Sequence, residues 1–144
     1  MFVMTKKFEF LEHTADTKIR AYGINLEDAF KNVVVATTSV MTNPDLLKEA
    51  SSKKVFVKSK NLKALLYDFL EEMLFLLDTE GFLAKKAVAL RIVERDGFEL
   101  SCELVGDFAS GGYDIHTTAK AATYSEMDIF DNDEKVVVQF VLDL

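Results

Sequence analysis

The chain has 144 residues and a formal net charge of −7. This length suits one domain with a sizeable core, and we expect a single domain over residues 1–144. The acidic balance argues against direct binding to nucleic acid, because affinity for phosphate backbones comes largely from Lys and Arg. The sequence shows no secretory signal and no apolar run long enough to cross a membrane, so we expect a cytoplasmic protein without a membrane partner.

The first third of the chain predicts two short strands followed by a helix. Alternating side chains indicate strands at residues 7–10 and 17–22. A helix is expected from Leu26 to about Met41, because apolar residues recur there at helical spacing. Asn25 is a suitable N-cap, and Pro44 cannot continue the helix.

The middle of the chain predicts a strand at residues 53–58 and a long amphipathic helix at residues 61–77. Asn61 is the expected N-cap and Gly81 the expected stop. Helical spacing places one apolar stripe against a sheet and leaves Glu71 on the opposite, exposed side. The residues expected to be buried are Leu62, Leu65, Phe69, Met73 and Leu76.

The C-terminal half alternates between apolar and polar residues. Residues 87–105 predict a hairpin that turns at Asp96-Gly97, with Cys102 facing the core. A second hairpin is expected to join residues 120–130 to residues 135–142. This order of elements predicts an α+β fold, with two amphipathic helices packed on a mixed, hairpin-rich β-sheet.

The usual enzyme motifs are absent from the sequence. There is no phosphate-binding glycine loop, no His-Glu-x-x-His, no Cys-x-x-Cys and no nucleophile elbow, so we predict no catalytic or cofactor-binding residue. His13 and His116 are the two histidines, and a loop histidine is more often structural or solvated than catalytic.

Acidic residues of the second helix form another candidate site. They are Asp68, Glu71 and Glu72, followed by Asp78 and Glu80. Such a face can hold a cation or contact a partner, but charge on the outside of a helix is usually only solvated. We favour the solvated interpretation.

The two ends of the chain carry the strongest candidate for chemistry. If the last strand lies beside the strand that Asp16 opens, then Asp16, Asp143 and the carboxylate of Leu144 converge. Clustered carboxylates repel one another unless a cation lies between them, so this arrangement predicts a divalent-metal site. The alternative is that Asp16 only hydrogen-bonds backbone N–H groups in a turn.

Several segments, in order along nearly the whole chain, resemble the archease family. They are residues 8–16 (Phe-Glu-Phe-Leu-Glu-His-Thr-Ala-Asp), 20–23, 26–30, 40–42, 61–62, 65–72 (Leu-Leu-Tyr-Asp-Phe-Leu-Glu-Glu), 78–81, 120–124 and 141–144. The chain differs from many members at Ser125, where they have histidine, so no histidine role carries over to that position.

The resemblance implies an archease-like fold and a non-catalytic role as partner of an RtcB-type RNA ligase in tRNA splicing. Archeases promote the metal-dependent guanylylation of that ligase. The family's metal site corresponds here to Asp16, Asp143 and the backbone of Leu144, with Glu12, His13 and Lys120 as further functional candidates. The oxygen ligands suit Ca²⁺, Mg²⁺ or Mn²⁺.

Two other functions remain open from the sequence. The first is a general chaperone or a modulator of another RNA-modifying enzyme, such as a tRNA methyltransferase, which should expose a large apolar patch. The second is a metal-dependent hydrolase, for which Glu12 or His13 would have to act as the base.

Overall fold

A computed structural model of the chain describes residues 6–11 and 16–144. Within these residues, strands and helices follow one another in the predicted order. They are β1 (Phe8–Leu11), β2 (Asp16–Gly23), α1 (Leu26–Met41), β3 (Ser51–Ser59), α2 (Leu62–Glu80), β4 (Phe82–Glu94), β5 (Phe98–Phe108), β6 (Ala121–Asp131) and β7 (Val136–Asp143). Two short 3₁₀ helices, Pro44–Leu46 and Ala109–Gly111, follow α1 and β5.

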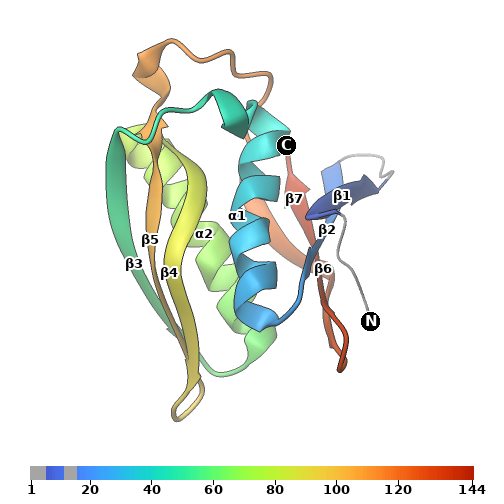
Figure 1. The fold of residues 1–144 in the computed structure, drawn as a ribbon. Helices are drawn as coiled ribbons and strands as arrows, with labels where there is room; N and C mark the ends of the chain where they lie inside the picture. Colours follow the sequence, from blue (N-terminus) through green and yellow to red (C-terminus); the bar gives the residue numbers. More distant parts are fainter. Residues whose placement is uncertain (1–5, 12–15) are drawn as a thin grey trace.

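The strands form two sheets, with both helices between them (Figure 1). One sheet has the order β1-β2-β7-β6 and the other the order β3-β5-β4. Helix α1 packs on β4 and β2, and α2 packs on β6 and β3. The predicted α+β class is confirmed, but the single mixed sheet is corrected: all strand pairs in the described residues are antiparallel. Alternation along a strand shows that it has a buried face, but not which strands it pairs with.

The helix ends follow local sequence signals. The side chains of Asn25 and Asn61 accept hydrogen bonds from the backbone N–H groups of Asp28 and Ala64, both at 2.8 Å. Gly81 ends α2 in the left-handed conformation with φ +70°, which glycine adopts without steric cost. Both predicted caps and the glycine stop are therefore confirmed.

The core lies between the two sheets and is centred on the helices. Leu65, Phe69, Met73 and Leu76 are buried, as predicted. Leu62 is only half-buried, although it packs against the core. Glu71 is also half-buried, so its predicted exposure is wrong. The reason is that α2 has a sheet on two sides, whereas helical spacing alone suggested one.

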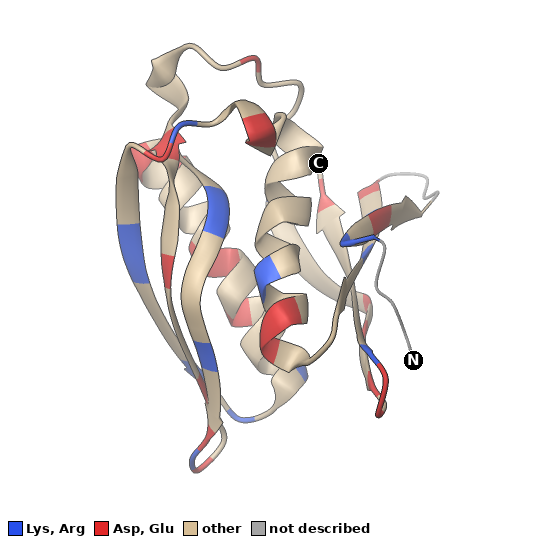
Figure 2. Ribbon diagram, in the orientation of Figure 1, with Lys and Arg blue, Asp and Glu red and all other residues tan. Residues whose placement is uncertain are grey.

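Charge is distributed unevenly over the elements (Figure 2). Lysines and an arginine occur along β3 and β4, whereas α2 carries five acidic residues and one lysine. None of the helices described by the structure is both long and apolar enough to cross a membrane.

Candidate metal centre

The register of β2 and β7 brings two carboxylates together at the ends of the chain. Asp16 lies directly opposite Asp143 in this antiparallel pair. Directly opposed residues project from the same face of a sheet with their Cβ atoms about 5 Å apart. Alternation places this pair on the outer face, because the neighbouring Leu142 faces the core. The predicted proximity of Asp16 and Asp143 is therefore present in the fold.

The chain end is held beside this pair by packing and by a backbone hydrogen bond. Leu144 is half-buried and packs against the core. The N–H of Lys120 donates to the carbonyl oxygen of Asp143 at 2.7 Å. Chain ends usually fray unless such contacts fix them. The fold thus places Asp16, Asp143, Leu144 and the backbone of Lys120 in one region.

The donor groups in this region suit a hard cation. Two opposed carboxylates repel each other across the strands, and a divalent cation would offset that repulsion. The described residues contain no cluster of three or more His, Cys, Asp or Glu side chains with metal-binding geometry. The backbone of Leu144 and water molecules can supply further oxygen ligands. Oxygen donors of this kind fit Ca²⁺, Mg²⁺ or Mn²⁺.

The other residues that the sequence singled out are Glu12, His13, His116 and Cys102. Glu12 and His13 lie outside the described residues. His116 is exposed, and its backbone N–H donates to the carbonyl oxygen of Met41 at 2.7 Å, which fixes the segment before β6 to the end of α1. Cys102 is buried, and burial raises the pKa of its thiol to about 11, so it is not poised as a nucleophile.

Sequence reasoning did not identify Lys18 as a neighbour of the acidic pair. It lies two residues beyond Asp16 on β2 and therefore on the same outer face. Its ammonium group forms an ion pair with Glu126 at 3.0 Å. The alternation of side chains along the strand from Asp16 would have shown which face of the sheet Lys18 lies on, but not that Lys18 pairs with Glu126. Glu126 becomes a neighbour because the β6–β7 pairing is irregular between Thr123 and Asp128.

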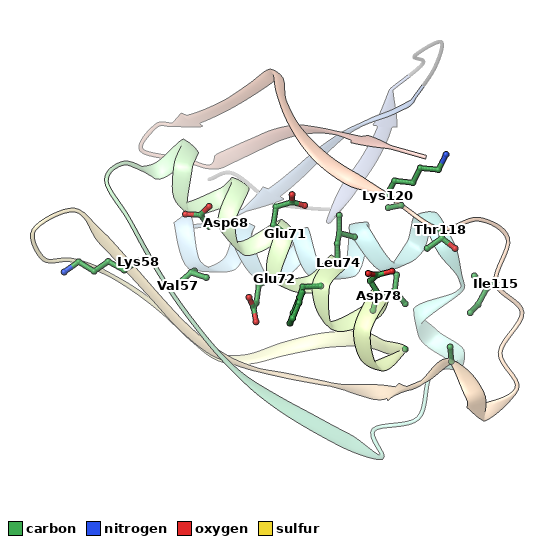
Figure 3. Close-up of a pocket in the computed structure, with 15 residues that line it drawn as sticks. Val57, Lys58, Asp68, Glu71, Glu72, Leu74, Asp78, Ile115, Thr118 and Lys120 are labelled. Atoms are coloured by element: carbon green, nitrogen blue, oxygen red, sulfur yellow. The ribbon is translucent and has the colours of Figure 1, made fainter.

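The acidic face of α2 lines a groove, which we call the α2 groove (Figure 3). Its volume is about 970 Å³, and it runs between β3 and residues 115–120 with α2 as its floor. Asp68, Glu71, Glu72 and Asp78 all line it. The sequence showed the acidic face, but only the packing of three separate segments forms the groove.

Comparison with known proteins identifies the family. A model of the Archease protein family matches residues 8–144. The chain belongs to the archease family. It is 37% identical to protein archease of Methanothermobacter thermautotrophicus over 96% of this chain and 99% of that protein. It is 35% identical to protein archease-like of Drosophila melanogaster, over 89% of this chain and 83% of that protein.

Solved structures agree with this assignment. The solution structure of Methanobacterium thermoautotrophicum protein 1598 superimposes with a TM-score of 0.82 at 34% identity, covering 96% of this chain and 99% of that one. The crystal structure from Thermotoga maritima, described as an archease and possible chaperone, covers both chains fully with a TM-score of 0.60. At 18% identity, the second comparison supports the fold alone. The family resemblance of the sequence is confirmed.

Proposed function

We propose that this protein is a non-catalytic activator of an RtcB-type RNA ligase in tRNA splicing. In this role it promotes the metal-dependent guanylylation of the ligase by GTP and so supports turnover. Membership of the archease family supports the proposal, and the observation that carries it is the pairing of Asp16 with Asp143 beside the chain end. The ligase, not this acidic chain, would hold the RNA, since the net charge of −7 opposes phosphate binding.

The proposed metal ligands are Asp16, Asp143 and the backbone or terminal carboxylate of Leu144. A bound Ca²⁺, Mg²⁺ or Mn²⁺ would neutralise the paired carboxylates and fix the two ends of the chain relative to each other. Lys120 lies at the same edge, because its N–H binds the backbone of Asp143. We propose that Lys120 contributes a cationic side chain to the surface that meets the ligase. Glu12 and His13 lie outside the described residues and stay functional candidates from the family resemblance.

The test is formation of the ligase–guanylate intermediate from labelled GTP, with and without substoichiometric amounts of this protein. We expect faster and more complete labelling with the wild-type chain, and no acceleration with Asp16→Asn or Asp143→Asn. Asp133→Asn, in the exposed turn between β6 and β7, is the matched control and should activate fully. Equal labelling with and without the wild-type protein would refute the proposed function.

The distribution of exposed apolar residues bears on the chaperone alternative. Among the described residues, the large exposed apolar side chains are Phe10, Ile24, Leu46, Phe56, Phe75, Ile115, Tyr124 and Phe130. Tyr124 and Phe130 share β6, Phe75 and Ile115 line the α2 groove, and the other four come from four different elements or connections. A general chaperone would be expected to present a larger contiguous patch. This distribution supports the ligase-specific role over the general one.

A further inference from the structure

The α2 groove combines an exposed apolar centre with acidic residues on both sides. Phe75 projects from α2 with 58% of its surface exposed, and Ile115 faces the same groove with 37% exposed. Figure 3 shows Glu71 and Glu72 pointing from α2 toward opposite sides. An exposed phenylalanine bordered by charge is a common feature of a surface that binds another protein.

The acidic residues form one stripe along the helix. Asp68, Glu72, Phe75 and Asp78 follow each other at spacings of three or four residues, which places them on one face over about 15 Å of helix axis. No ion pair links Asp68, Glu71, Glu72 or Asp78 to a cation within residues 6–11 and 16–144. The Asp68 carboxylate accepts a hydrogen bond from the hydroxyl of Ser59, so Glu72 and Asp78 are the members of the stripe whose charge is most available to a partner.

The two lysines that line the groove do not neutralise this stripe. Lys58 lies at one end and forms an ion pair with Glu99 at 3.5 Å. Lys120 lies at the opposite end of the groove (Figure 3). Among the described residues, neither lysine forms an ion pair with Asp68, Glu72 or Asp78.

The charges of the stripe also oppose what the helix itself would favour. Asp68 and Glu72 are like charges four residues apart, which destabilises a helix. Asp78 lies in the last part of α2, where the helix dipole favours a cation, and no basic residue is present in the last turn. Helix stability alone does not account for this arrangement, whereas attraction of a cationic partner does.

The walls of the groove are fixed before any partner arrives. The segment between Gly112 and β6 is held at one end by the hydrogen bond from the hydroxyl of Thr42 to the carbonyl of Asp114 at 2.7 Å. At the other end it is held by Lys120, whose N–H binds Asp143. Ala119, between them, is buried. A preformed groove loses less conformational entropy on binding than a flexible one.

We propose that the α2 groove binds a cationic amphipathic segment of a partner protein. Apolar side chains of that segment cover Phe75 and Ile115, and its Lys or Arg residues pair with Glu72 and Asp78. This inference is independent of the proposed ligase activation, because it rests on the charge and shape of a different surface from the paired aspartates.

The experiment uses a fluorescent peptide of roughly 14 residues, with leucines at helical spacing and lysines between them. Fluorescence anisotropy with the full chain measures its dissociation constant. The double variant Glu72→Lys/Asp78→Lys should weaken binding about tenfold, and Phe75→Ser should do the same. The control Asp133→Lys/Glu134→Lys changes the net charge equally, but in the exposed β6–β7 turn, and should change the affinity less than about twofold.

Thermal unfolding of the same variants excludes simple misfolding. Asp78→Lys should leave the melting temperature unchanged or raise it, because a cation then lies at the C-terminal end of α2. Loss of peptide affinity in a folded, equally stable variant supports the groove as the binding surface. Equal weakening by the control pair would instead show non-specific charge attraction and overturn the proposal. It would also be overturned if sedimentation showed a dimer that Phe75→Ser disrupts, since a second copy would then occupy the groove.

Discussion

The ring of Tyr67 on α2 lies flat against the ring of Tyr124 on β6, with ring centroids 4.3 Å apart and ring planes 4° apart. This stack joins the helix layer to the edge of the β1-β2-β7-β6 sheet. The hydroxyl of Tyr67 also donates to Glu71 at 3.4 Å, and the Glu71 carboxylate raises the pKa of Tyr67 above its usual value. The Glu71 carboxylate also accepts a hydrogen bond from the backbone N–H of Ala122 on β6 at 3.4 Å, so Glu71 is a contact between layers instead of a solvated residue.

The stack predicts energetic coupling between the two tyrosines. A double-mutant cycle with Tyr67→Ala and Tyr124→Ala should give a coupling free energy of about 0.5–1.5 kcal/mol by urea unfolding. Phe130→Ala, also exposed on β6, serves as the control with Tyr67→Ala and should be additive. Additivity of the two tyrosine substitutions would show that the stack contributes nothing.

The core position of Phe69 predicts a large loss of stability on truncation. Phe69 is fully buried, and its ring centroid lies 6.1 Å from that of Phe30 on α1. Phe69→Ala should lower the free energy of unfolding by about 3–5 kcal/mol through lost burial and a residual cavity. Phe56→Ala on β3, with 62% of its surface exposed, should change it by less than about 1 kcal/mol. Chemical denaturation of both variants measures the difference.

Two neighbouring threonines of α1 should respond in opposite ways to substitution by valine. The hydroxyl of Thr38 donates to the carbonyl of Ala84 at 2.6 Å, whereas the buried hydroxyl of Thr37 has no hydrogen-bond partner in the part of the chain that the structure describes. Thr38→Val should cost about 1–3 kcal/mol, because the buried carbonyl loses its donor. Thr37→Val should be neutral or stabilising by up to about 1 kcal/mol. A loss of stability in Thr37→Val equal to that in Thr38→Val would contradict this difference.

The opposed aspartates predict that stability and metal binding change in opposite directions. In metal-free buffer, Asp143→Asn should raise the free energy of unfolding by about 0.2–1 kcal/mol, since like charges directly opposite destabilise a strand pair. The same variant should lose the stabilisation that Ca²⁺ or Mn²⁺ gives to the wild type. Calorimetric titration and thermal unfolding with Asp133→Asn as control provide the measurement. Unchanged cation affinity in Asp143→Asn would remove this residue from the proposed site.

The fixed chain end predicts that extensions at the two termini have different effects. Residues added after Leu144 displace the terminal carboxylate from the edge beside Asp16. We expect cation affinity to fall about tenfold, equivalent to ~1.4 kcal/mol, and ligase activation to fall with it. A tag before Met1 should be tolerated. Full cation affinity in the C-terminally extended form would leave Asp143 as the ligand from this end of the chain.

The sequence by itself determined the order of elements and the local features that set their ends. Asn25 and Asn61 cap helices through hydrogen bonds to residues three positions away, and Gly81 ends α2 because glycine adopts the left-handed backbone conformation. These effects are local, so they can be recognised without knowing the fold. The family motifs and the suggestion that Asp16 approaches Asp143 were also available from the sequence. The tertiary structure supplied the register that places these two residues directly opposite each other.

Other features were decided only by the tertiary structure, because they depend on contacts between distant segments. Helical periodicity showed that α2 has an apolar stripe, but not that a second sheet covers another side and partly buries Glu71. Strand alternation likewise showed that each strand has a buried face, but it did not show which strands pair to form the two antiparallel sheets. The α2 groove has the same origin, since β3, α2 and residues 115–120 form it only after they pack together.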